Sequence, residues 1–118
     1  MMIRPNRQFT PPTDMIEQAD KLLVIVEIAG MRAGDFNIIL YNRQLTITGI
    51  RQRPDTAVAA YHRVEIGFGK FRIDLNLPWS VDREAVSTSY EHGFLTIEIP
   101  RKPAEHIRVV DRSAQEQE

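Results

Sequence analysis

Apolar residues recur at every second position in much of the chain, which is the spacing of half-buried β-strands. The clearest run is "KFRIDLNLP", in which polar and apolar side chains alternate until Pro78 ends the pattern. The apolar members of this run share one face: Phe71, Ile73, Leu75 and Leu77. The pattern predicts a strand with one face in a core.

A second run, "KLLVIVEIAG", is apolar on both faces and ends at Gly30. Four of its residues share one face: Leu22, Val24, Val26 and Ile28. Leu23 and Ile25 lie on the opposite face, so the run predicts a strand that is covered on both sides.

Two further stretches predict hairpins. Asn42-Arg43 separates two alternating runs in "DFNIILYNRQLTITGI", and His92-Gly93 does so in "AVSTSYEHGFLTIEIP". No window keeps the 3.6-residue period of a helix, and "MRAGDF" and "SVDREA" suffice for single helical turns only. About seven short strands with regular turns predict an all-β fold, an immunoglobulin-like antiparallel β-sandwich.

The domain organisation follows from where this pattern starts and stops. The 118 residues are enough for one domain with a single core. We expect a short flexible N-terminal arm at residues 1–12, the sandwich at 13–102 and a C-terminal extension at 103–118. Inside the sandwich, residues from about 51 to 69 predict a long loop. A short strand near residues 60–63 that pairs outside its own sheet would explain that length.

Composition and charge restrict the function. The formal net charge is -1 and the charges are interleaved, so the chain lacks the basic stripe of a nucleic-acid-binding protein. No apolar run reaches the ~20 residues that span a bilayer, and the N-terminus has no signal-peptide core. There is no cysteine, which excludes disulfides and thiolate metal sites. We therefore expect a cytoplasmic protein that neither binds nucleic acid nor spans a membrane.

Motifs for catalysis are missing as well. The three histidines, His62, His92 and His106, do not have the spacing of a metal site. No serine lies in a G-x-S-x-G elbow, and no glycine-rich stretch matches a phosphate-binding loop. The sequence therefore predicts no catalytic residue, no cofactor-binding residue and no metal ligand. An enzyme is not expected.

The C-terminal stretch "RKPAEHIRVVDRSAQEQE" places apolar residues in a charged tail: Ile107, Val109 and Val110. They form either a last core strand or a segment that binds elsewhere. Pro100 and Pro103 separate them from the sandwich and favour the second interpretation.

The segment "GFGKFRIDLNLPWSVDREAVSTSYEHGFLTIEIPRK" resembles the signature of the alpha-crystallin domain of small heat-shock proteins. The family pattern contains Gly-x-Phe, Leu-Pro, Val-Asp, Gly-x-Leu and Pro-Lys/Arg, in that order. Its counterparts here are Gly69 and Phe71, Leu77-Pro78, Val81-Asp82, Gly93 and Leu95, and Pro100-Arg101. "LTITGIRQ" resembles the family's Leu-x-Ile-x-Gly-x-Arg, and "YHRVEIGFGKF" is similar to bacterial and plant members. The resemblance covers about residues 12–110.

The resemblance implies three interaction sites. In the family, a strand of the long loop is exchanged between two subunits, and the residues in question here are Tyr61, His62, Arg63 and Val64. A tail motif, Ile-x-Ile or Ile-x-Val, binds an apolar groove, and its counterparts are Ile107 and Val109. The implied groove residues are Phe36, Ile38, Leu40, Val86, Thr88 and Tyr90. Whether the tail binds its own domain or a partner subunit stays open.

The implied function is that of an ATP-independent holdase chaperone, which binds partly unfolded client proteins and suppresses their aggregation. Such binding needs no catalytic residue, because exposed apolar surface is enough. The implied partners are these clients and further copies of the chain, in a dimer or a larger homo-oligomer. The alternative is a co-chaperone or adaptor module of the same fold, which binds one folded partner and protects nothing by itself.

The chain also departs from the family pattern. Ile66 and Ile73 stand where the family frequently has arginine, which predicts a more apolar dimer interface or a different geometry. Thr88 replaces a usual alanine in the groove. The arm before the domain is shorter than in many members, and we expect weaker assembly and client capture from it.

Overall fold

The alternating runs of the sequence form the strands of the computed structural model, which describes residues 8–102 and 106–115. In chain order the described strands are β1 (Thr13–Glu17), β2 (Lys21–Glu27), β3 (Phe36–Tyr41), β4 (Gln44–Arg51), β5 (Gly69–Asn76), β6 (Ser87–Glu91) and β7 (Phe94–Pro100). Two 3-10 turns, η1 (Ala33–Asp35) and η2 (Arg83–Ala85), lie where the sequence predicted single helical turns. A short helix, α1 (Arg112–Gln115), lies in the C-terminal segment.

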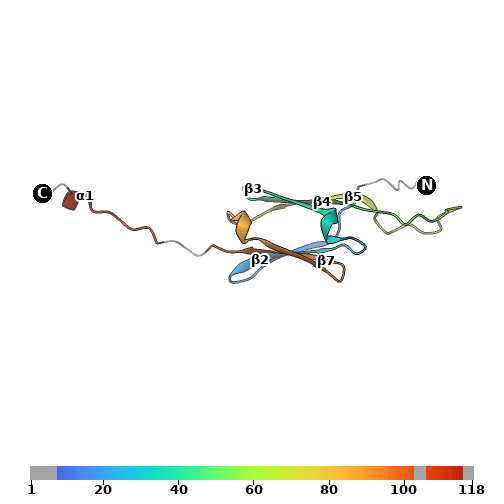
Figure 1. Cartoon of the computed structure of the whole chain (residues 1–118), viewed down its shortest axis with the longest axis horizontal. Helices are drawn as coiled ribbons and strands as arrows, with labels where there is room; N and C mark the ends of the chain where they lie inside the picture. Colours follow the sequence, from blue (N-terminus) through green and yellow to red (C-terminus); the bar gives the residue numbers. More distant parts are fainter. Residues whose placement is uncertain (1–7, 103–105, 116–118) are drawn as a thin grey trace.

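The strands form two sheets that face each other (Figure 1). The four-stranded sheet has the order β1-β2-β7-β6 and the three-stranded sheet the order β3-β4-β5. Every strand pair within them is antiparallel. The prediction of an all-β antiparallel sandwich is confirmed.

The core lies between the two sheets. In β2 the predicted inner face is confirmed, since the four residues Leu22, Val24, Val26 and Ile28 are buried. Leu23 and Ile25 are only half-buried because they point to the outer face of their sheet, so the prediction of a strand covered on both sides is wrong. The other buried apolar residues are Leu45, Ile47, Phe71, Ile73, Leu77, Leu95, Ile97 and Ile99. Each such side chain contributes roughly 1.5–3 kcal/mol through burial.

Ile73 belongs to this core and not to an interface. It is opposite Ile47 in the register of β4 and β5, and only 4% of its surface is exposed. Ile73 lies two residues after Phe71 in β5, so its side chain points to the same inner face of the sheet. The expectation that Ile73 alters a dimer interface is therefore wrong. Ile66 is 64% exposed and stays accessible to a partner.

Both predicted hairpin turns are present. Asn42, with φ 55, begins the turn between β3 and β4. His92 and Gly93, with φ 53 and 82, join β6 to β7. Tight two-residue turns require this left-handed backbone, which asparagine and glycine adopt more readily than most residues.

The N-terminal strap, defined here as residues 8–12, crosses from one sheet to the other. The Phe9 N–H donates to the Lys70 carbonyl of β5 at 3.3 Å. The Glu27 N–H of β2 donates to the Pro12 carbonyl at 3.0 Å, and Pro11 is buried between these two contacts. The strap thus connects the sheets along the side of β5 and β2. The rest of the predicted arm, residues 1–7, lies outside the described residues.

The sandwich ends at Arg101. Its N–H donates to the Asp20 carbonyl at 2.8 Å, and its guanidinium lies 5.1 Å from the ring centroid of Trp79. These contacts hold the end of β7 from which the C-terminal segment departs. That end is opposite the end from which the long loop, residues 52–68, extends (Figure 1).

Candidate functional site

The predicted groove lies between two edge strands, β3 of the smaller sheet and β6 of the larger one. Phe36, Ile38 and Leu40 alternate on the inner side of β3 and are half-buried against the core. Val86 and Tyr90 line the β6 side and are half-buried too. Because β3 and β6 are edge strands, each has a neighbouring strand on one side only, and these side chains stay partly exposed.

One end of the groove is closed by two aromatic rings. The centroids of Phe36 and Tyr90 lie 5.2 Å apart with the rings tilted by 53°. The Tyr90 hydroxyl donates to the Ile28 carbonyl at 2.7 Å and accepts the Met31 N–H at 3.3 Å. These bonds anchor the tip of Tyr90 to the segment that follows β2.

The other end of the groove is open. Beside Leu40 lies a hollow of about 430 Å³, lined by Leu40, Asn42, Ser80, Val81 and Arg83. Thr88, on β6, is exposed and lies opposite the core residue Ile97 in the strand register. The arrangement offers an apolar wall on β3 and a mixed wall on β6.

The residues predicted for strand exchange lie in the long loop. Residues 52–68 contain no strand in the described chain, so Tyr61, His62, Arg63 and Val64 have no sheet partner within it. Their contacts are local: the Arg53 guanidinium lies 5.7 Å from the Tyr61 ring centroid, and Arg63 pairs with Glu65 at 3.6 Å. The predicted pairing concerns a second subunit and stays a prediction.

The tail residues do not reach the groove of their own domain. Ile107 is 84% exposed and Val109 89% exposed, and Val110 is exposed as well. The alternative interpretation, in which these tail residues form a last strand of the core, is therefore wrong. Pro103 itself lies outside the described residues, so the predicted role of that proline is not observed.

Two charged side chains on the outer face of the smaller sheet, Arg72 and Asp74, pair with each other. Asp74 accepts hydrogen bonds from Arg72 at 2.9 Å and from Thr46 at 2.8 Å, which lowers the pKa of its carboxyl. All three side chains lie on the outer face of the smaller sheet. Across residues 8–102 and 106–115, no group of three His, Asp or Glu side chains is arranged to hold a metal ion. Within the same residues, no helix is long and apolar enough to cross a membrane.

Two residues that make contacts in the structure were not predicted to do so from the sequence. Val81 lines the groove hollow, although the sequence assigned it only to a family motif. Phe9 packs edge-to-face on Phe71 at 5.8 Å, although the sequence assigned it to a flexible arm. The Leu-Pro-x-x-Val-Asp spacing is a signal that points to Val81. Nothing local pointed to Phe9, because its partner lies 62 residues further along the chain.

The two packed antiparallel sheets define the class of this protein as a β-sandwich. The family model described as Hsp20/alpha crystallin family matches residues 14–113. The chain belongs to this family, which comprises small heat-shock proteins, chaperones that use no ATP and are not enzymes. The resemblance seen in the sequence is confirmed.

Individual relatives agree with this membership. Small heat shock protein C4 of Rickettsia felis is 31% identical over 98 residues, which cover 82% of this chain and 60% of that protein. The 22.0 kDa heat shock protein of Arabidopsis thaliana is 32% identical over 108 residues, or 87% of this chain and 55% of that protein. This chain thus spans less than two thirds of these two relatives.

Solved structures show the same fold. The crystal structure of a small heat-shock protein from Xylella fastidiosa matches with a TM-score of 0.77 and 25% identity. The match covers 89% of this chain and 97% of that one. The structure of hspA from Xanthomonas axonopodis matches with a TM-score of 0.76 and 25% identity, over 84% of this chain and all of that one.

Proposed function

We propose that this protein is a cytoplasmic ATP-independent holdase, which binds partly unfolded proteins and keeps them from aggregating. One observation carries the proposal. The chain presents an apolar tail motif, Ile107 and Val109, and an apolar groove between β3 and β6, and neither is filled by the other. Exposed apolar surfaces support reversible binding to other chains.

Further apolar side chains are exposed around the sandwich. On the long loop these are Val58, Tyr61 and Ile66, and on the strands they are Met15, Ile16, Ile39, Tyr41, Ile50 and Phe94. Unfolded segments expose similar side chains, and their association with these surfaces removes both from water. Binding the unfolded form lowers its free concentration and so slows aggregation.

Strand exchange between two copies is the proposed basis of the dimer. Strand β1 is an edge strand that pairs with β2 on one side only, and Met15 and Ile16 on it are 44% and 41% exposed. An edge of this kind accepts a further strand. The loop segment Tyr61–Val64 of a partner would supply it, because the segment has no sheet partner among the residues that the structure describes.

The tail motif would bind the groove of another subunit. Burying Ile107 and Val109 contributes roughly 3–5 kcal/mol, whereas ordering the backbone costs about 1–2 kcal/mol per residue. One tail therefore binds weakly, and a stable oligomer requires several tails at once. Weak contacts of this kind also permit exchange of subunits and transient exposure of the groove.

A light-scattering assay of a heat-labile client tests the holdase. We expect an equimolar amount of this protein to suppress the rise in scattering without added nucleotide. An unchanged aggregation curve would refute the proposal. Recovery of one stoichiometric partner from unstressed cells, without protection of the client, would favour the adaptor alternative.

A further inference from the structure

Phe9 occupies a recess built from three residues of the domain. The ring of Phe71 meets it edge-to-face at 5.8 Å, and the Arg51 guanidinium lies 5.0 Å from its centroid. The third wall is Gly67, at which a Cβ atom would come within 2.6 Å of the Phe9 ring. We call Arg51, Gly67 and Phe71 the Phe9 socket. The socket has room for an aromatic ring because Gly67 has no side chain.

The socket does not depend on Phe9 for its shape. The Arg51 side chain donates to the Gly67 carbonyl at 2.9 Å and to the Ala29 carbonyl at 3.1 Å, and it also stacks on Phe68 at 5.3 Å. Phe71 is only 2% exposed and fixed in the core. These contacts keep all three walls in place when the ring between them leaves.

The backbone of Phe9 makes few contacts with β5. Phe9 is half-buried, and one backbone hydrogen bond, to the Lys70 carbonyl at 3.3 Å, joins it to β5. Its bridge to Phe71 is a single isolated pair, and the rest of this edge of β5 has no strand partner in the described chain. The other anchor of the strap is the Pro12 carbonyl, which accepts the Glu27 N–H of β2 in the opposite sheet. Phe9 can therefore leave while the strap stays attached.

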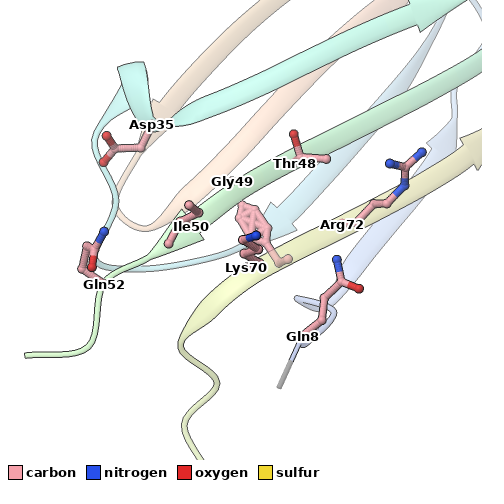
Figure 2. A pocket seen from close by; sticks show the side chains of 9 residues that line it. Gln8, Asp35, Thr48, Gly49, Ile50, Gln52, Lys70 and Arg72 are labelled. Carbon is pink, nitrogen blue, oxygen red and sulfur yellow. The ribbon is translucent and has the colours of Figure 1, made fainter. Parts of the chain in front are cut away.

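Space for the neighbours of an incoming aromatic residue lies beside the socket. A hollow of about 510 Å³ is lined by residues that include Gln8, Ile50, Gln52, Lys70 and Phe71. Figure 2 shows Gln8 on one side of Lys70, and Ile50 and Gln52 on the other. The free edge of β5 and this hollow would accommodate a short extended segment on either side of its aromatic residue.

We propose that the Phe9 socket is a binding site for an aromatic side chain on an extended segment of a partly unfolded protein, and that Phe9 competes for it from within the chain. The occupant gains an edge-to-face contact with Phe71, a cation–π contact with Arg51 and a backbone hydrogen bond to Lys70. Only the role of this site in protecting clients rests on the proposed holdase function.

Two single variants separate this proposal from a structural role of Phe9. Phe9→Ala empties the socket, whereas Gly67→Ala displaces Phe9 and fills its place with a methyl group. The probe is a dye-labelled peptide, Gly-Ser-Thr-Phe-Thr-Ser-Gly, measured by fluorescence anisotropy. A second peptide with leucine in place of phenylalanine is the matched control. Thermal unfolding of each variant, with Phe9→Leu as a milder change, verifies that the domain folds.

We expect Phe9→Ala to bind the phenylalanine peptide about tenfold more tightly than the unchanged protein, because an internal competitor that fills the site ~90% of the time lowers affinity by that factor. Gly67→Ala should show no such gain, and neither should the leucine peptide. In isotope-labelled Phe9→Ala protein, the amide resonances of Gly67 and Lys70 should shift on titration.

Three results would overturn the proposal. Equal peptide affinity of Phe9→Ala and the unchanged protein would show that Phe9 does not compete for a site. Equal gains in Phe9→Ala and Gly67→Ala would assign the effect to release of the strap. A fall in particle mass in Phe9→Ala without tighter peptide binding would assign the socket to a second copy of the chain.

The peptide titration is independent of the client assay. Tighter peptide binding without any suppression of aggregation would refute the holdase and leave the socket standing. Suppression of aggregation that is the same in all variants, with no gain in peptide affinity, would refute the socket and leave the holdase proposal standing.

Discussion

The rings of Phe36 and Tyr90 lie 5.2 Å apart and join the edge of one sheet to the edge of the other. Phe36 also lies 6.2 Å from Phe71, whose ring meets Phe9 on its other side. A chain of four aromatic rings thus runs from the N-terminal strap through the core to the closed end of the groove. These contacts connect the strap and the groove to the core.

Tyr90→Phe keeps the ring and removes only the hydroxyl group. The variant loses the hydrogen bond to the Ile28 carbonyl and leaves the Met31 N–H without its acceptor. We expect a loss of about 1 kcal/mol in the free energy of unfolding, measured with urea. Tyr41→Phe is the control, because Tyr41 is 72% exposed and should not affect stability. Equal stability of both variants would contradict the role assigned to the Tyr90 hydroxyl.

Substituting arginine for isoleucine at two positions tests which of them lies in the core and which on the surface. Ile73→Arg places a charge at a site that is 4% exposed, and we expect a loss of roughly 3–5 kcal/mol. Ile66→Arg changes a site that is 64% exposed, and its effect should stay within about 0.5 kcal/mol. Urea unfolding followed by circular dichroism measures both. A stable Ile73→Arg variant would show that position 73 faces a partner after all.

Two glycines test the packing next to the core. Gly49→Ala would bring a methyl group within 2.6 Å of the Phe71 ring and 3.0 Å of the Asp35 carbonyl. We expect a cost of about 1–3 kcal/mol, since Phe71 and η1 must shift. Gly34→Ala meets nothing within 4 Å and should leave stability unchanged or raise it by about 0.4–1 kcal/mol. Thermal unfolding gives both values; equal melting temperatures would refute the close packing at Gly49.

The tail motif is tested by particle mass. Ile107→Ala combined with Val109→Ala removes the apolar groups that would fill the groove, and we expect smaller particles in light scattering after size exclusion. Arg108→Ala is the matched control, because its side chain would point to solvent between the two. If the double variant has the mass of the unchanged protein, the tail does not assemble subunits.

Strand exchange is tested with proline in the loop. Neighbouring residues of a strand direct their N–H groups to opposite sides, so His62→Pro or Arg63→Pro must remove a donor that faces the partner. The isolated chain has no strand there to lose. We expect one of the two variants to be monomeric by light scattering, whereas Ala57→Pro, outside the exchanged segment, should stay dimeric. Dimers in all three would refute the exchange.

Much of the fold could be predicted because the alternation of apolar and polar residues within a strand shows which of its faces is buried. The alternation in "KFRIDLNLP" identified the inner face of β5, and asparagine and glycine identified the two hairpin turns. The groove residues were predicted from the family resemblance, and their role in binding stays a prediction. Ile73 was assigned wrongly because the family comparison considered which residue it replaced, not the face on which its position lies.

The order of neighbouring residues was enough to predict the strands, most of the inward-facing residues and the membership of the family. The contact of Phe36 with Tyr90 and the position of Phe9 in the recess at Gly67 became visible in the folded chain. These contacts join residues more than 50 positions apart. No local pattern encodes such a distance. The stacking of the two sheets brings Phe36 to Tyr90, and the attachment of the strap to β5 brings Phe9 to Gly67.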